Sequence, residues 1–409
     1  MPGAAAQAAP TRLLVVGEEH VRGKVARHYS ALEAATGVQA TFFVDDRSGI
    51  TRQTSEQFPI RVCYTVNPRG GGASPLRYWR DFVRAFHAVR PHVLELYNSI
   101  HPFLLIPMAA YAAARGVPRV SIARGELIPE LFDHLPTSTK RLERVLLRMM
   151  DVVIYKDFKV LDALRRECPG VPTAPWLNAI PVGPEPGYAR DGNHVLFLNT
   201  FHPLRNLPVI VRAARRIRQA VPDAELHLVG GAADLAGRSP FFSELGEHER
   251  EVRALIDAEG VGGFVHIHPF TSEVAPHFAR AKAYLFPADH VFCNYGLLEA
   301  MERGVPPIVS DQRDPDARRI VRHGENGMLV PITPEGVADA VVALLTDEPR
   351  RQEMARAARR TIEEGYDLST RLHDLAEMYR SLAGGRGAPR PSAPAPVAAR
   401  AEAPAGANR

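Results

Sequence analysis

A glycine-marked helix start in the C-terminal half has the features best suited to bind a diphosphate. The stretch from Asp289 to Pro331 reads as a strand end, a loop, a helix that begins near Tyr295 or Gly296, a glycine stop and a further strand. Backbone N–H groups in the first turn of such a helix lack an acceptor within the helix and attract anions without a metal ion. Glu299 lies one turn into the helix, where its carboxylate can accept hydrogen bonds from the vicinal hydroxyls of a ribose. The alternative is a glutamate that only complements the helix dipole.

A second candidate anion site follows the first apolar run. That run leads into Gly17, and the loop continues to Gly23 and Lys24. A glycine turn between a strand and a helix is where doubly wound domains bind anions. The loop is not a Walker A sequence, because five residues rather than four separate Gly17 from Gly23 and Val25 replaces the magnesium-binding Ser or Thr. It is not GxGxxG either, so a nucleotide triphosphatase and a dinucleotide oxidoreductase are disfavoured. An ordinary strand-to-helix turn is the alternative.

Alternating short apolar runs and helix-length amphipathic stretches position these turns. In the N-terminal half, the pattern predicts helices at 22–35, 102–115 and 139–150 and strands at 13–16, 40–44, 93–96, 119–122 and 152–154. In the C-terminal half, it predicts a helix at 206–220 and strands at 194–198, 224–229, 264–267, 283–286 and 307–309. This rhythm indicates parallel sheets covered on both faces, and thus an α/β fold of two doubly wound, Rossmann-like domains facing a cleft.

The boundaries between these parts follow from composition. Residues 178–187 hold three prolines and two glycines, which is typical of a linker. Residues 384–409 include nine alanines and five prolines and offer little to bury, so they are expected to be disordered. We therefore expect a disordered arm at 1–10, domains at 11–178 and 193–364, a linker at 179–192, a helix at 365–383 and a disordered tail at 384–409.

The overall composition excludes several classes of protein. The 409 residues are 45% hydrophobic and 23% charged, which is typical of a globular chain of two or three domains. The net charge is +4, but the tail contributes +3 (four Arg minus one Glu), so the remainder carries only +1 and gives no reason to expect nucleic acid. Cys63, Cys168 and Cys293 are far apart, which predicts neither a disulfide framework nor a metal-binding pair and favours a reducing cytosol. No apolar run approaches the length of about 20 residues that a membrane span needs.

The stretch around Glu299 resembles the nucleotide-sugar site of the retaining family-4 glycosyltransferases, which have the GT-B fold. The segments that match in order and spacing are Leu298-Glu299-Ala300-Met301, Gly304-Val305-Pro306, Ile308-Val309-Ser310-Asp311 and Gly324-Glu325-Asn326-Gly327-Met328-Leu329-Val330-Pro331. The family's last helix also has a counterpart between Tyr366 and Tyr379, and in such proteins this helix crosses back onto the first domain. The resemblance implies donor contacts from Gly17, Asp289, Tyr295, Gly296, Leu297, Leu298 and Glu299.

Upstream residues extend the resemblance more weakly. Arg205 stands where the family has a lysine, and its guanidinium can still clamp a diphosphate. Gly230 matches a strand-to-glycine turn that contacts the donor, and His268 lies in the strand and loop that recognise the nucleobase. The alternative for Arg205 is a surface residue at a helix start. His266 and His268 share a strand face, so a metal pair is conceivable, but no third ligand is near and packing histidines are favoured. We expect no metal.

Two residues depart from the family pattern. Thr200 replaces an arginine, and Val291 replaces the glutamate that stands eight residues before Glu299 and normally contacts the donor sugar. Asp289 or His290 could fill this role from a nearby position. The alternative for Asp289 is a plain loop carboxylate.

The acceptor side is expected in the N-terminal half. Arg124 and Glu126 lie in a segment that resembles the family variant Ser-Pro-Arg-Gly-Glu-Leu, which implies that Arg124 faces the cleft and meets phosphate or acceptor. Asn98 and His101 follow another predicted strand, and sites in α/β folds form at the carboxyl ends of strands. A helix-terminal histidine is the alternative for His101. The predicted helix at 139–150 is basic and amphipathic, so contact with an anionic membrane is open, although packing of its apolar face is favoured.

The resemblance implies a glycosyltransferase that moves a sugar from a nucleotide-diphosphate donor to an acceptor with retention of configuration. Its catalytic residues would be Arg124, Arg205 and Glu299, and it would need no metal or cofactor besides the nucleotide sugar as co-substrate. A glycan, a lipid-linked saccharide and a small molecule are open as acceptors, in a bacterial glycan or glycoconjugate pathway. We expect the protein in the cytoplasm, with peripheral contact at the inner membrane face left open. The alternatives are a non-catalytic sugar-nucleotide-binding scaffold and another GT-B enzyme, such as a sugar-nucleotide epimerase.

Overall fold

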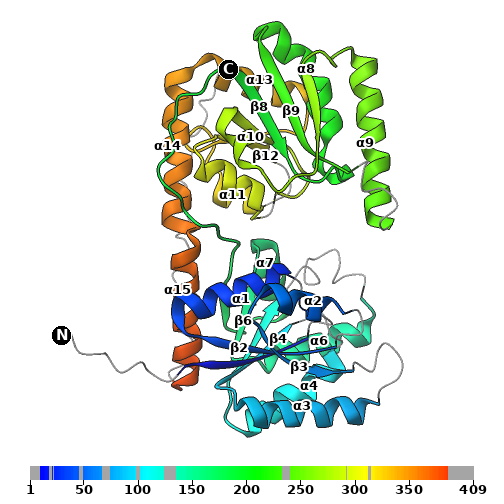
Figure 1. The fold of residues 1–409 in the computed structure, drawn as a ribbon, viewed down its shortest axis with the longest axis vertical. Coiled ribbons are helices and arrows are strands. Elements are labelled where there is room, and N and C mark those ends of the chain that lie inside the picture. Colours follow the sequence, from blue (N-terminus) through cyan, green and yellow to red (C-terminus); the bar gives the residue numbers. More distant parts are fainter. Residues whose placement is uncertain are drawn as a thin grey trace, which may run out of the picture. The chain divides into compact units, whose positions relative to one another are not determined.

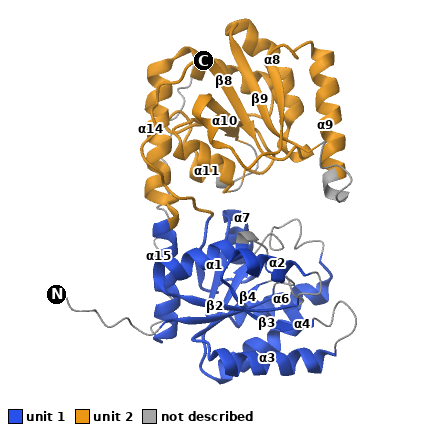
Figure 2. Ribbon diagram, in the orientation of Figure 1, with its two compact units in different colours: residues 1–177, 369–393 blue, residues 178–368, 394–409 orange. Residues whose placement is uncertain are grey.

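The chain divides into two compact units, which Figure 2 shows in different colours. The computed structural model describes residues 10–17, 21, 23–45, 49–66, 74–97, 102–123, 135–232, 240–291, 293–311 and 315–385. Unit 1 comprises residues 1–177 and 369–393, and unit 2 comprises residues 178–368 and 394–409. Each unit is built around one parallel sheet (Figure 1).

Unit 1 holds a seven-stranded sheet in the order β3-β2-β1-β4-β5-β6-β7. Its strands are β1 (Arg12–Val16), β2 (Gln39–Asp45), β3 (Arg61–Thr65), β4 (Val93–Tyr97), β5 (Arg119–Ala123), β6 (Val152–Tyr155) and β7 (Thr173–Pro175). Its helices are α1 (Gly23–Thr36), α2 (Ile50–Gln57), α3 (Pro75–Val89), α4 (Pro102–Ala114), α6 (Thr137–Arg148), α7 (Phe158–Glu167) and α15 (Leu368–Ala383). Every residue of β4 and β6 is buried, as a parallel sheet covered on both faces requires.

A buried carboxylate holds two helices on the sheet of unit 1. Glu95 of β4 is fully buried and accepts hydrogen bonds from the phenol groups of Tyr29 on α1 and Tyr379 on α15. Burial raises the pKa of both phenols well above the ordinary value, and the carboxylate adds to that rise. Both phenols therefore stay protonated and can donate to Glu95. This cluster fixes α15, which is far away in sequence, against the centre of the sheet.

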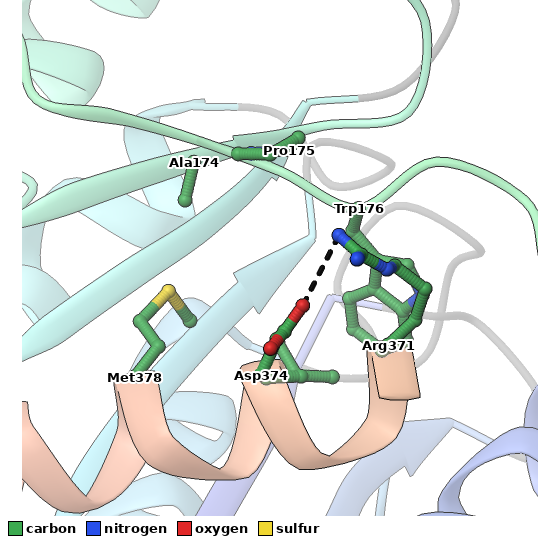
Figure 3. Close-up of a pocket in the computed structure, with 7 residues that line it drawn as sticks. Ala174, Pro175, Trp176, Arg371, Asp374 and Met378 are labelled. Carbon is green, nitrogen blue, oxygen red and sulfur yellow. Dashed lines mark ion pairs between the residues drawn. The ribbon is translucent and has the colours of Figure 1, made fainter. Parts of the chain in front are cut away.

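A second contact of α15 lies beside β7. Figure 3 shows Arg371 and Asp374 of α15 near Trp176, joined by an ion pair whose N···O distance is 3.1 Å. The cavity that these residues line measures only ≈ 20 Å³, which is room for about one water molecule. It is a packing void rather than a substrate site.

Unit 2 holds a six-stranded parallel sheet in the order β10-β9-β8-β11-β12-β13. Its strands are β8 (Asn193–Leu198), β9 (Ala224–Gly231), β10 (Val265–Pro269), β11 (Ala281–Phe286), β12 (Pro307–Ser310) and β13 (Met328–Val330). Its helices are η3 (Pro203–Arg205), α8 (Leu207–Ala220), α9 (Pro240–Glu259), α10 (Ala275–Arg280), α11 (Tyr295–Glu302), α12 (Pro315–Ile320), α13 (Pro334–Thr346) and α14 (Glu348–Gly365).

The segment predicted to be a linker is bound along α14 within unit 2. The guanidinium of Arg359 donates to the backbone oxygen of Gly183 and, at 2.7 Å, to the carboxylate of Glu302 on α11. Ile180 forms a parallel bridge with Asp367. These contacts tie the proline-rich stretch to the helices of unit 2.

The prediction of two doubly wound parallel sheets is confirmed. The sequence pattern missed three strands, namely β3, β7 and β13, each of which lies at a sheet edge. Edge strands can be short and partly exposed, so they lack the long apolar run that marks a central strand.

Among the described residues, no helix is both long and apolar enough to cross a membrane. On α6, the helix considered for membrane contact, Leu146 and Leu147 are buried in unit 1 while Val145 is exposed.

Candidate functional site

A cavity of ≈ 330 Å³ lies at the carboxyl ends of the central strands of unit 2. From β8, the strands β9 and β10 follow toward one edge of the sheet, and from β11 the strands β12 and β13 follow toward the other edge. Ligands of open α/β sheets bind outside the strand ends at such a switch point, which here lies between β8 and β11. The cavity is lined by the ends of β8 and β9, the segment after β10 and the start of α11, through Leu198, Asn199, Thr200, Val229, Gly230, Phe270, Thr271, Asn294, Tyr295, Gly296 and Glu299.

Two glycines allow the backbone to approach closely at this cavity. Gly230 has a φ of 128°, and a Cβ atom there would lie 1.9 Å from the backbone oxygen of Asn199. A Cβ atom on Gly296 would lie 2.8 Å from the hydroxyl of Tyr284 and 3.0 Å from the backbone oxygen of Leu198. The start of α11 therefore packs directly against the end of β8, in a position that a larger residue could not occupy without displacement.

The first turn of α11 faces this cavity, as the sequence predicts for a diphosphate site. Asn294 is the N-cap, and its side-chain oxygen accepts a hydrogen bond of 2.8 Å from the backbone N–H of Gly296. An anion at this helix start would compete with Asn294 for that N–H group. The sequence analysis missed Asn294, although asparagine immediately before a predicted helix is a known N-cap signal. The side chains of Leu297 and Leu298 are fully buried, so only their backbone groups can meet a ligand.

Glu299 lines the cavity with a half-buried carboxylate. Within the described part of the chain, this carboxylate has no hydrogen-bond partner. Burial raises its pKa, an effect that Arg303 opposes and Glu302 reinforces. A partly desolvated acceptor of this kind gains free energy when a ligand hydroxyl donates to it. Tyr295, the other titratable residue among the described lining residues, is half-buried as well.

Arg205 lies close to the cavity but does not line it. Its guanidinium stacks over Phe286, with the carbon 5.2 Å from the ring centre, and donates to the backbone oxygen of His290 at 3.3 Å. Its Nε–H is buried without a hydrogen-bond partner among the described residues. Burial lowers the pKa of Arg205. Burial also raises the pKa of Tyr284, and the nearby positive charge of Arg205 opposes that rise. Arg205 thus places a positive charge beside Tyr284, the residue that contacts Gly296.

Asp289 takes part in holding the loop that carries Arg205. Its carboxylate accepts a hydrogen bond of 3.1 Å from Asn206, which also donates to the backbone oxygen of Pro287 at 3.0 Å. Asn206 has a φ of 56° and is the N-cap residue that precedes α8. Val291 is fully buried, so the position at which the resemblance expects a glutamate points into the core. Thr200 does line the cavity, where its hydroxyl donates to Asn199 at 3.3 Å.

His268 lies on β10 outside the described lining of the cavity, whereas Phe270 and Thr271 just beyond it contribute to that lining. The side chain of Phe270 is 60% exposed, which is unusual for a large aromatic residue and leaves its ring free to stack with a planar ligand. The sequence analysis did not single out Phe270. An aromatic residue three positions after the strand predicted at 264–267 was the available signal.

The candidates in unit 1 are only partly described. Gly17 follows β1 with a φ of 119°, and a Cβ atom there would lie 2.5 Å from the backbone oxygen of Tyr97 at the end of β4. It therefore lies at the switch point of the first sheet, between β1 and β4. The acceptor-side candidates Asn98, His101, Arg124 and Glu126 and the side chain of Lys24 lie outside the described residues.

Comparisons with known proteins cover the region that contains this cavity. Residues 185–361 match the family model described as glycosyl transferases group 1. Over 216 residues, the chain is 29% identical to a phosphatidyl-myo-inositol mannosyltransferase of Mycobacterium tuberculosis, covering 48% of this chain and 50% of the relative. Over 173 residues, it is 31% identical to a D-inositol 3-phosphate glycosyltransferase of Pseudarthrobacter chlorophenolicus, covering 40% of this chain and 37% of the relative. The matches thus span about half or less of these relatives.

Solved structures share the fold across most of the chain. A glycosyltransferase from Rickettsia africae has a TM-score of 0.72 at 13% identity, covering 92% of this chain and 99% of that one. Anabaena HepE in complex with UDP and glucose has a TM-score of 0.66 at 17% identity, covering 91% of this chain and 100% of that one. Both are too distant in sequence to show more than the fold. The fold is GT-B, and the match over residues 185–361 supports the group 1 glycosyltransferase family.

Proposed function

We propose that the protein is a glycosyltransferase that transfers a sugar from a nucleotide-diphosphate donor to an acceptor with retention of configuration. The observation that carries the proposal is the cavity at the switch point of unit 2. It is lined by the start of α11 and by the carboxylate of Glu299, which has no hydrogen-bond partner among the described residues. The match of this region to the group 1 glycosyltransferase model supports it.

In this proposal, each part of the donor has its own contact in the cavity. The diphosphate binds at the first turn of α11, where the helix dipole stabilises negative charge. Glu299 accepts hydrogen bonds from the ribose hydroxyls, and the exposed ring of Phe270 stacks on the nucleobase. Stacking of a base on an aromatic side chain contributes about 1–3 kcal/mol. Arg205 adds positive charge near the leaving diphosphate.

The proposed reaction requires no metal ion. As the bond to the sugar breaks, negative charge grows on the diphosphate, and the helix start together with Arg205 stabilises it. A phosphate oxygen of the leaving group takes the acceptor proton on the same face of the sugar, which retains the configuration. Arg124, Glu126, Asn98 and His101 remain the predicted acceptor-side residues. The relatives' names favour inositol-containing phosphates and lipids as the first acceptors to test.

A panel of nucleotides tests the donor site. The full chain is mixed with UDP, GDP and ADP and their sugar derivatives, and the unfolding temperature is measured at increasing concentration. A ligand that binds the folded state raises this temperature. Glu299→Gln should weaken binding of the active nucleotide by roughly 10–150-fold, because a hydrogen bond to a charged group contributes about 1.5–3 kcal/mol. Glu335→Gln, at an exposed position on α13, is the matched control.

Three outcomes separate the proposals. If no nucleotide raises the unfolding temperature, the donor site is refuted. Binding with transfer to an inositol acceptor, or with slow donor hydrolysis, supports the enzyme. Binding without either reaction supports a non-catalytic nucleotide-sugar-binding subunit, which the burial of Val291 and the loss of an arginine at Thr200 favour.

A further inference from the structure

A cluster of histidines crosses three neighbouring strands of unit 2 on one face of the sheet. His194 of β8 is paired in register with Glu225 of β9, and His227 of β9 is paired with His266 of β10. Residues two apart on a strand share a face. The side chains of His194, Glu225 and His227 are 17%, 44% and 19% exposed, whereas Leu226, between Glu225 and His227, is buried. These polar side chains therefore gather on an accessible part of the sheet.

The three donor atoms of this cluster have the spacing of a metal-ligand set. His194 Nδ1 lies 3.0 Å from His227 Nε2, and the carboxylate oxygen of Glu225 lies 3.3 Å from the former and 3.5 Å from the latter. A tetrahedral Zn²⁺ ion with bonds of about 2.0–2.2 Å holds its ligand atoms roughly 3.3–3.6 Å apart. The triangle of donor atoms already matches one face of such a tetrahedron to within a few tenths of an ångström.

The surroundings orient the two imidazoles. His227 Nδ1 lies 3.0 Å from His268 Nε2, so the second nitrogen of His227 is engaged by a neighbour, as is usual for metal-binding histidines. The ring of His266 stacks on that of His227, with centroids 5.2 Å apart. Gly192 packs against the imidazole of His194. A Cβ atom on Gly192 would lie 2.8 Å from Nε2 of this imidazole, so a larger residue there would displace the ring. The sequence analysis considered His266 and His268 as a metal pair that lacks a third ligand. Among the described residues, the set of close donor atoms lies instead on β8 and β9, at His194, Glu225 and His227.

The residue types of the cluster also suit a cation. An imidazole offers a nitrogen lone pair and a carboxylate offers negatively charged oxygen atoms, and these are the forms in which both ligand types bind a divalent metal ion.

We propose that His194, Glu225 and His227 form a binding site for a divalent transition-metal ion, with Zn²⁺ as the best match. Two imidazole nitrogens and one carboxylate oxygen suit this ion and leave a fourth position for water. The site is separate from the donor cavity, because His194 stands four residues before Leu198 on β8, which is a distance of about 13 Å along the strand. The ion links β8 to β9 and so stabilises the sheet of unit 2.

Cobalt and zinc titrations of the untagged full chain test this site. The protein is first dialysed against a chelator, and Co²⁺ is then added while the visible absorption of four-coordinate cobalt is recorded. We expect one equivalent to bind, to be displaced by Zn²⁺, and to raise the unfolding temperature. His194→Gln and His227→Gln should abolish the cobalt absorption. His268→Phe should weaken the affinity by roughly 10–100-fold, as expected for a partner of a metal ligand. His373→Gln, at an exposed histidine of α15, is the matched control and should bind as the wild type does.

The outcomes are distinct. Loss of the absorption in both ligand variants, with far-UV circular dichroism unchanged and the control unaffected, supports the site. If either variant fails to fold, Glu225→Gln replaces it, because this side chain is 44% exposed and the change should be tolerated. Binding that is equal in the wild type and in the folded ligand variants, or no binding of either ion to the wild type, overturns the proposal. The cluster would then be a group of packed and hydrogen-bonded histidines only.

Discussion

Replacing Gly230 by alanine should damage the proposed donor cavity of unit 2 more than any other single methyl group added to its described wall. The residue has a φ of 128°, which L-amino acids rarely adopt. Its new Cβ atom would lie 1.9 Å from the backbone oxygen of Asn199, and Cβ atoms essentially never come closer than 3.0 Å to a non-bonded neighbour. The two backbone segments must therefore separate by about 1.1 Å (3.0 minus 1.9).

Two magnitudes follow from this geometry. The rare φ alone should lower the free energy of unfolding by about 1–3 kcal/mol. Because Asn199 and Gly230 both line the cavity, the separation also shifts its wall. The loss of one hydrogen bond to the ligand costs about 1–3 kcal/mol, so the Kd for the nucleoside diphosphate should rise roughly 5–150-fold.

The assay combines urea unfolding with isothermal titration of the nucleoside diphosphate that stabilises the wild type. Gly263→Ala is the matched control, since Gly263 is exposed and nothing lies within 4 Å of its Cβ position. If the free energy of unfolding of Gly230→Ala equals that of the wild type, the steric reasoning is refuted. If this free energy falls but the Kd for the nucleoside diphosphate is unchanged, the link between Gly230 and the ligand is refuted.

Three further predictions concern charge and burial. Arg205→Ala should raise the Kd for the nucleoside diphosphate roughly tenfold or more in calorimetry, because a charge-assisted interaction is lost, whereas Arg212→Ala at an exposed position of α8 should leave it unchanged. Tyr379→Phe should lower the free energy of unfolding by about 1–3 kcal/mol in urea titrations, because the buried carboxylate of Glu95 loses a donor; a neutral effect would contradict the role given to this cluster. The pKa of His28 is lowered to about 3, by burial first and by Lys156 second, so between pH 6.5 and 3 the unfolded chain binds a proton that the folded chain does not. The free energy of unfolding should therefore fall on acidification through this window, and His28→Phe should flatten that dependence in urea titrations at a series of pH values.

The central strands were predictable from sequence because a parallel sheet covered on both faces needs continuous apolar runs. The residues of β6, Val152–Tyr155, are all buried and were recognised. Arg61–Thr65 of β3 has only its last residue buried, and β13 is three residues long, so neither edge strand carries that signal. The apolar pattern reports burial, and at a sheet edge the backbone hydrogen bonds determine the strand instead.

The donor cavity was predictable where its residues are close in sequence. Tyr295, Gly296 and Glu299 share one helix start, and their spacing alone places them together. The histidine cluster was not predictable in this way, because His194, His227 and His268 are separated by more than thirty residues at each step. Only the pairing of β8, β9 and β10 brings them into contact. Arg205 shows an intermediate case. Its charge was recognised, but its stacking on Phe286 and its position outside the described lining depend on side-chain packing.

The composition of the cavity wall also bears on which chemistry this unit can perform. Among the described lining residues, Glu299 is the only carboxylate, and Asp289 is engaged with Asn206 outside the lining. Glycoside hydrolases of the usual kind need two carboxyl groups that flank the scissile bond, one as the acid and the other as the base or nucleophile. A wall with one carboxylate, held near a helix start that attracts phosphate, lacks that pair. It favours a reaction in which the leaving diphosphate itself takes the proton of the attacking hydroxyl group, as in the proposed mechanism.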